Sequence, residues 1–224
     1  MWTVKRFLIA ALALLVVAPL LFVVYEGVHT LRILTAVERE RDQWQRPADV
    51  LRALVLTEGA TVVDLGAGAG YFALKLSAQV GARGIVLAED VRVESLAFLW
   101  IRRFTRGAHN VRVILGTPGD PHLPAGAADA VLIANTYHEL SVPGAILDAA
   151  FGAMKPGARL VILDRKIRSA SAADATEAGH HGVPPGRVRR EIREHGFEPI
   201  AHEEQFIDRP QDDDIWWMIV ARKP

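Results

Sequence analysis

The sequence predicts an α/β fold with a mostly parallel, seven-stranded sheet, helices on both faces, and one transmembrane helix in front. Three observations support this prediction. From Pro47 onward, short apolar runs alternate with amphipathic stretches, which is typical of βαβ units. A glycine-rich turn joins the first apolar run to a helix, as in parallel sheets that bind ligands. A long apolar segment near the N-terminus precedes this pattern.

The N-terminal segment is long enough to cross a membrane. Residues 7–24 are all uncharged and apolar, and at 1.5 Å per residue they reach about 27 Å, close to the roughly 30 Å of bilayer hydrocarbon. We therefore expect residues 1–27 to form a transmembrane anchor. A cleaved signal peptide is the alternative, but the run is long and no small residues follow it at positions 24–26. Residues 28–46 are predicted to continue as an amphipathic linker helix, and residues 47–224 to form the main domain.

Charges flanking the apolar segment leave its orientation open. Lys5 and Arg6 favour a cytoplasmic N-terminus, whereas Arg32, Arg39 and Arg41 pull the other way. Overall, Lys plus Arg and Asp plus Glu are equal at 26 each, so we expect no nucleic-acid partner. The chain has no cysteine, which excludes disulfides, thiolate metal sites and thiol nucleophiles, and we expect no metal site.

The elements of the main domain follow from hydrophobic periodicity. The predicted strands are 61–65, 84–89, 111–115, 130–134, 159–164, 199–206 and 215–221. The predicted helices are 48–56, 70–79, 93–106, 143–154 and 185–195. In the third of these helices one apolar stripe is expected to pack into the core; it comprises Val93, Leu96, Ala97, Trp100, Ile101 and Phe104.

The strongest local signal is the turn after the first strand. Asp64 ends that strand, and Gly66, Gly68 and Gly70 follow it before a helix. Glycine lets a backbone turn sharply and approach a ligand closely, because it has no Cβ. A dinucleotide-binding fingerprint needs its third glycine three positions after Gly68, where this chain has Tyr71.

This spacing resembles the signature loop of class I S-adenosylmethionine-dependent methyltransferases, specifically the small-molecule, ubiquinone-biosynthesis-like branch. The passage from Met154 to Asp164 is also similar to one in that branch. The resemblance implies a Rossmann-like sheet with S-adenosylmethionine as cofactor. It also implies that the turn holds this cofactor through Asp64, Gly66, Ala67, Gly68, Gly70 and Tyr71.

Further cofactor-binding residues follow from the resemblance. Glu89 and Asp90 come about 20 residues after the glycine turn, where a carboxylate can accept hydrogen bonds from ribose hydroxyls. The family phrase favours Asp90; alternatively, both acids are solvated and cap the next helix. Asp120 matches the acid that contacts the adenine amino group, and Asn135 lies at the tip of the central strand.

Catalytic candidates cluster at the same tip, which comprises Tyr137, His138 and Glu139. Methyl transfer needs a general base only when the acceptor loses a proton, and histidine exchanges protons near neutral pH. His138 is therefore the expected base, while Glu139 either orients it or caps the next helix. His180 and His181 are candidates for a substrate lid or for solvated loop residues.

The last predicted helix is strongly basic, with arginines at 187, 189, 190 and 193. These arginines either form a solvated face or contact anionic head groups or an acidic substrate. Together the observations predict a membrane-anchored methyltransferase that acts on a small or lipophilic acceptor. Because S-adenosylmethionine is made in the cytosol, we expect a cytoplasmic domain, with a periplasmic one as the alternative. Two other functions stay open: an inactive cofactor-binding assembly protein, and an NAD-type oxidoreductase.

Overall fold

The computed structural model describes residues 2–168 and 182–224, without the side chains of residues 2–4, 7–12 and 14. The chain divides into two compact units, residues 1–43 and 44–224, which are described separately.

The N-terminal unit is one long helix. Helix α1 spans Trp2–Trp44, so the predicted anchor and linker segments form a single helix without a break. From Leu15 onward this helix is long and apolar enough to cross a membrane, with a mean hydropathy of 1.5 in its most apolar window. An N-terminal helix with the composition of a membrane span is therefore present.

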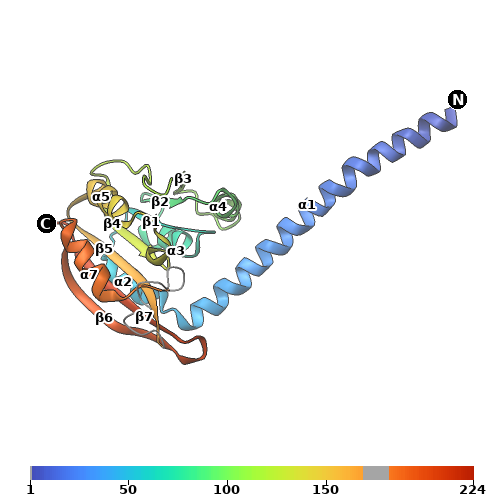
Figure 1. Cartoon of the computed structure of the whole chain (residues 1–224). Coiled ribbons are helices and arrows are strands. Elements are labelled where there is room, and N and C mark those ends of the chain that lie inside the picture. The colour runs from blue at the N-terminus through green and yellow to red at the C-terminus, as the bar shows by residue number, and fades with distance from the viewer. Residues whose placement is uncertain (1, 169–181) are drawn as a thin grey trace. The chain divides into compact units, whose positions relative to one another are not determined.

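The second unit is built on a seven-stranded sheet with the order β3-β2-β1-β4-β5-β7-β6 (Figure 1). The strands are β1 Thr61–Leu65, β2 Ile85–Asp90, β3 Val111–Leu115, β4 Ala128–Ala134, β5 Met154–Ile167, β6 Glu198–Arg209 and β7 Asp214–Arg222. The first five are parallel, and β7 runs antiparallel to both β5 and β6. The predicted mostly parallel, seven-stranded sheet is confirmed. Strand β5 is longer than predicted, because its polar end at Arg165 and Lys166 still pairs with β7.

Helices cover both faces of the sheet (Figure 1). They are α2 Pro47–Leu54, α3 Tyr71–Val80, α4 Val93–Thr105, α5 Pro143–Ala153 and α7 Pro185–Glu194, with short 3₁₀ turns η1 Tyr137–Glu139 and η2 Pro210–Asp212. Helices α2, α3 and α4 pack into one apolar core, and α5 and α7 pack into the other. Between β3 and β4 the chain crosses through residues 116–127 without a helix. A loop therefore borders the carboxyl ends of the strands there.

The predicted packing of α4 is largely wrong. Of the expected stripe only Leu96 is buried, whereas Trp100 and Phe104 are 52% and 48% exposed and Val93 and Ile101 also face outward. The side chains that α4 does bury include Leu99 and Arg102. The prediction failed because the wider apolar stripe was assumed to face the sheet, while the narrow face through Leu96 and Leu99 does so.

Candidate functional site

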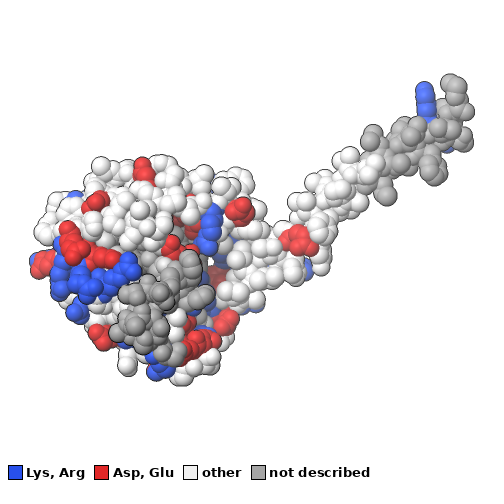
Figure 2. All heavy atoms as spheres, viewed as in Figure 1, with Lys and Arg blue, Asp and Glu red and all other residues white. Residues whose placement is uncertain are grey.

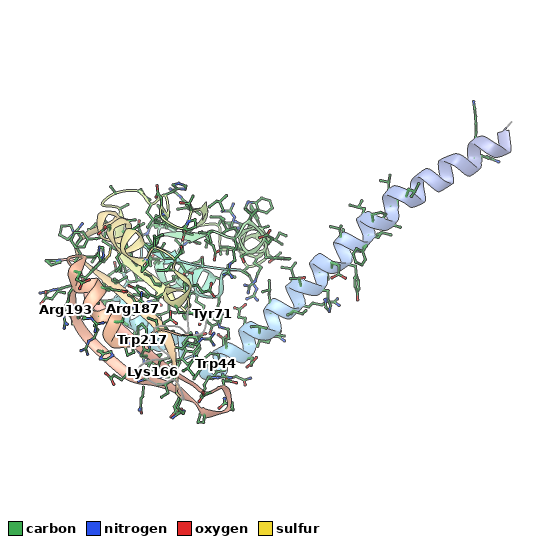
Figure 3. All side chains as sticks on the ribbon, in the orientation of Figure 1. Trp44, Tyr71, Lys166, Arg187, Arg193 and Trp217 are labelled. Atoms are coloured by element: carbon green, nitrogen blue, oxygen red, sulfur yellow. The ribbon has the colours of Figure 1, made fainter. Side chains whose placement is uncertain are left out.

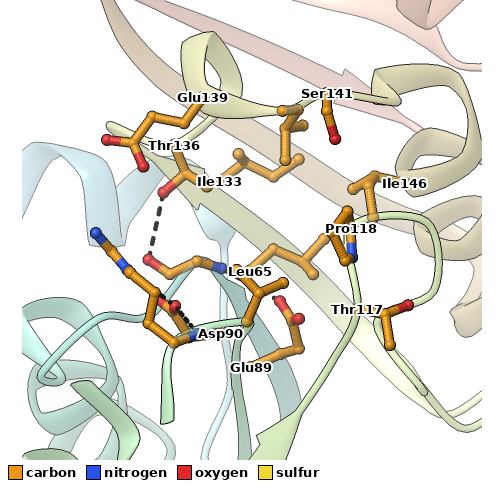
Figure 4. A pocket seen from close by; sticks show the side chains of 14 residues that line it. Leu65, Glu89, Asp90, Thr117, Pro118, Ile133, Thr136, Glu139, Ser141 and Ile146 are labelled. Atoms are coloured by element: carbon orange, nitrogen blue, oxygen red, sulfur yellow. Dashed lines mark hydrogen bonds and ion pairs between the residues drawn. The ribbon is translucent and has the colours of Figure 1, made fainter. Parts of the chain in front are cut away.

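A pocket opens at the carboxyl ends of the parallel strands, where β1 lies between β2 and β4 (Figure 4). Open α/β sheets bind ligands at this edge, where successive crossovers leave a strand in opposite directions. The pocket is lined by Leu65, Gly66, Glu89, Asp90, Val91, Arg92, Thr117, Pro118, Ile133, Thr136, Glu139, Leu140, Ser141 and Ile146. The lining therefore combines three carboxyl groups with apolar side chains.

The glycine turn borders this pocket through Gly66. Gly66, Gly68 and Gly70 have φ angles of 71°, 55° and 89°, in the left-handed region that favours glycine. A Cβ on Gly66 would overlap the side chain of Thr136, and one on Gly70 would overlap Leu99. Glycine is thus required at positions 66 and 70 both by conformation and by close packing.

Neighbouring elements hold the turn in place. The Ala67 amide donates to the Glu89 carbonyl at 2.7 Å, and the Gly70 amide donates to the Ala67 carbonyl at 2.9 Å. From α4, the buried Arg102 guanidinium donates to the Ala69 carbonyl at 2.5 Å. The turn is therefore fixed by β2 and α4 before any ligand binds.

Asp90 is tied directly to the glycine turn. Its Oδ2 accepts a hydrogen bond from the Gly68 amide at 2.8 Å, and its Oδ1 accepts from the Arg92 amide at 2.9 Å and from Arg92 Nε at 3.2 Å. The hydrogen bond to Asp90 raises the pKa of the Arg92 guanidinium. Asp90 is 2% exposed, yet it lines the pocket. A fixed carboxylate at the end of β2 can accept hydroxyl hydrogen bonds there.

Glu89 is a second buried carboxyl in the pocket, and its environment differs from that of Asp90. Burial raises the pKa of Glu89 to about 7, opposed in part by the Gly66 amide, which lies 3.5 Å from Oε2. Glu89 pairs in register with the apolar Leu65 on β1 and Ile114 on β3. Glu89 is thus largely protonated below neutral pH and can donate as well as accept.

At the tip of β4, Thr136 and Glu139 line the pocket. Asn135 adopts a φ of 56°, and its buried Oδ1 has no hydrogen-bond partner among the described residues. Tyr137 is buried, and its hydroxyl donates to Glu191 of α7 at 2.6 Å. The Tyr137 hydroxyl therefore anchors α7, and it is engaged away from the pocket lining.

His138, in the turn η1, forms a buried pair with Asp164 of β5. The carboxylate of Asp164 accepts from the His138 backbone amide at 3.1 Å, and its Oδ1 lies 2.8 Å from His138 Nδ1. An ionised carboxylate can only accept a hydrogen bond, so this contact favours the His138 tautomer that has its proton on Nδ1 and its lone pair on Nε2. Nε2 lies 3.7 Å from Oε1 of Glu139, which lines the pocket, whereas His138 itself is not one of the lining residues.

Sequence reasoning did not single out Asp164 as a functional residue. One feature of the sequence could have indicated it, because Asp164 is an acidic residue directly after the apolar run Leu160–Leu163. The structure buries this run fully, on the strand next to β4. A carboxyl in that position needs a partner, and the tip of the neighbouring strand supplies His138.

Other expected residues lie outside the pocket lining. The side chain of Asp120 is 65% exposed and accepts from the His122 amide at 2.8 Å, while Thr117 and Pro118 of the same loop face the pocket. Asp64, near the end of β1, and Tyr71, at the start of α3, are buried and do not line the pocket. The candidates at 180 and 181 lie outside the described residues. Within residues 2–168 and 182–224, no cluster of three metal-ligating side chains occurs.

Known proteins with similar sequences are methyltransferases. The profile of a family described as "Methyltransferase domain" matches residues 56–198. An arsenite methyltransferase of Halobacterium salinarum is 32% identical over 111 residues, covering 49% of this chain and 28% of that protein. The chain therefore matches little more than a quarter of that relative's length.

Solved structures share the same architecture. A SAM-dependent methyltransferase from Aquifex aeolicus superposes with a TM-score of 0.64 at 29% identity, covering 79% of this chain and 88% of that one. The [4+2]-cyclase SpnF superposes with a TM-score of 0.70 at 20% identity, covering 85% and 82%. At that lower identity the second similarity concerns the fold alone.

Proposed function

The chain belongs to the class I S-adenosylmethionine-dependent methyltransferases, and on that premise we propose that it methylates a small or lipophilic acceptor beside a membrane. S-adenosylmethionine is its cofactor. The observation that carries the proposal is the tie between Asp90 and the Gly68 amide, because it fixes a carboxylate against the glycine turn at the pocket wall.

The residues present fit the adenosyl part of the cofactor. Asp90 keeps acceptor capacity toward the ribose hydroxyls, since a carboxylate has about four lone-pair directions. Val91, Thr117 and Pro118 of the pocket lining offer small and apolar side chains for contact with a planar base.

We assign His138 the role of general base for acceptors that carry a proton. Bound S-adenosylmethionine supplies an electrophilic methyl group on a sulfonium. Nε2 of His138 then accepts the proton that the hydroxyl or amine of the acceptor releases, and Asp164 stabilises the resulting imidazolium. The His138 side chain is 2% exposed, which keeps water away from this proton.

Two features of the chain support a lipophilic acceptor. The pocket floor is apolar, with Leu65, Ile133, Leu140 and Ile146 in its lining. Helix α1 has the length and composition of a membrane span and would keep the domain beside the bilayer. A cytoplasmic domain has access to S-adenosylmethionine. Reporter fusions to the C-terminus test this topology, and a periplasmic signal would contradict it.

The experiment for the proposed activity is transfer of a labelled methyl group by the full chain in nanodiscs. We expect labelled product in lipid extracts or in a panel of small hydroxyl and amine acceptors, and about 10²- to 10⁴-fold slower transfer with His138→Ala. Binding of S-adenosylhomocysteine without any labelled product would favour an assembly protein. Stabilisation by NAD(H) but not by S-adenosylhomocysteine would favour an oxidoreductase.

A further inference from the structure

Helix α4 carries an apolar stripe on the side away from the sheet. The outer α4 face comprises Val93, Ala97, Trp100, Ile101 and Phe104, which repeat at helical spacing. All five side chains are exposed, and the rings of Trp100 and Phe104 stack edge to face with centroids 4.8 Å apart. Exposed aromatic stripes of this kind mark sites of interaction with another apolar surface.

Three arginines accompany the outer α4 face. Of the five arginines in residues 91–115, Arg102 is buried toward the glycine turn and Arg92 is paired with Asp90, which leaves Arg103, Arg106 and Arg112 for the rim. Arg106 and Arg112 are exposed, and the Arg103 guanidinium lies 4.7 Å from the centre of the Phe104 ring. The face therefore combines tryptophan, phenylalanine and aliphatic groups with a positive rim. This is the composition of helices that lie in the head-group region of anionic bilayers.

We propose that the outer α4 face rests on the bilayer that α1 is proposed to anchor, with its rim arginines against anionic lipid head groups. Tryptophan and phenylalanine are favourable at the boundary between head groups and acyl chains, and each arginine near an anionic surface adds electrostatic attraction. Anchoring makes this contact intramolecular, so a weak surface affinity is sufficient. The proposal rests on membrane anchoring and is independent of methyl transfer.

The inner face of the same helix supports the cofactor site. Leu99 packs where a Cβ on Gly70 would lie, and Arg102 donates to the Ala69 carbonyl. One helix therefore has the bilayer contact on its outer face and the glycine turn on its inner face. Bilayer contact would then set the orientation of the pocket relative to a lipophilic acceptor.

Helix α7 provides an internal contrast. Its arginines also form a basic surface, visible as blue atoms in Figure 2, and Arg187 and Arg193 are labelled in Figure 3. Its apolar residues Val188 and Ile192 are buried, so α7 exposes charge without an apolar stripe. Helices α4 and α7 pack on opposite faces of the sheet. A flat bilayer that contacts the outer α4 face therefore leaves α7 in water.

The test uses the absence of cysteine from the sequence. Ala97→Cys and Arg190→Cys are introduced separately into the full chain, labelled with an environment-sensitive fluorophore, and reconstituted in nanodiscs of phosphatidylcholine and phosphatidylglycerol. We expect brominated acyl chains to quench the label at position 97 at least about two-fold more than the label at 190. Aqueous iodide should show the opposite preference. Adding Trp100→Ser and Phe104→Ser to Ala97→Cys should remove the difference.

Two results would overturn the proposal. If iodide reaches both labels equally and brominated lipid quenches neither, the face lies in water. If the label at 97 is protected from both quenchers, protein covers the face, either α1 or a second copy of the chain. Thermal stabilisation of each labelled chain by S-adenosylhomocysteine checks that the fold and the cofactor site are intact. A failure of the membrane-contact proposal can therefore be distinguished from a failure of the methyltransferase assignment.

Discussion

Nδ1 of His138 lies 2.8 Å from Oδ1 of Asp164, and the exposed fractions of these two side chains are 2% and 0%. His138 lies in η1, shortly after β4, and Asp164 lies in the adjacent strand β5. A buried carboxylate that orients an imidazole fixes its tautomer and can stabilise its charged form, which supports the general-base role proposed for His138.

Replacing either member of this pair should reduce turnover without abolishing cofactor binding. For His138→Ala with a hydroxyl acceptor we expect kcat to fall about 10²- to 10⁴-fold, the range for loss of a general base. Asp164→Asn should also lower kcat, because it changes the preferred tautomer of His138. Calorimetric titration with S-adenosylhomocysteine provides the control. Equal losses of binding and turnover would indicate that the pair only supports the fold.

The glycine turn predicts an order of stability among alanine variants. Gly66→Ala requires a left-handed alanine and overlap with Thr136, so it should cost about 3 kcal/mol in free energy of unfolding. Gly68→Ala has the same backbone requirement but open space at Cβ, and should cost about 1 kcal/mol. Urea denaturation measures both. Similar costs for the two variants would show that contact with Thr136 does not constrain the turn.

Glu89 predicts a pH dependence of stability. Burial raises its pKa from 4.5 to about 7, so its protonated form is favoured in the folded state. The contribution of this group to stability is complete below about pH 4.5 and is lost as the pH rises through about 7, by at most about 1.4 kcal/mol per pH unit.

The Glu89→Gln variant should lack this slope. Urea denaturation of the unmodified protein and of Glu89→Gln at about pH 5 and about pH 8 isolates the contribution of Glu89 to stability. The two proteins share all their other titrating groups. A difference between the two proteins that does not change with pH would contradict an elevated pKa of Glu89.

Much of the fold follows from local sequence patterns. The strands β1 and β3 begin and end at the predicted residues, because turn residues bound each of these short, mainly apolar runs on both sides. Glycine spacing located the pocket wall for a similar reason, since Gly66 and Gly70 are needed for both conformation and packing.

Features that depend on tertiary contacts were harder to predict. The outward face of α4 could not be chosen from periodicity, because both sides of this helix carry apolar residues and only packing against β2 and β3 distinguishes them. Asp164 required knowledge that β4 and β5 are neighbours. The exposed position of Asp120 follows from its hydrogen bond to the His122 amide in a loop that no periodic pattern describes.

Isothermal titration calorimetry of the full chain with S-adenosylmethionine and S-adenosylhomocysteine tests the central claim most directly. We predict saturable binding of both ligands at one site per chain. Asp90→Asn should weaken binding by at least about ten-fold, or about 1.4 kcal/mol, because a ribose acceptor is lost. Absence of binding to the unmodified chain would contradict the assignment of the glycine turn and Asp90 as the cofactor site.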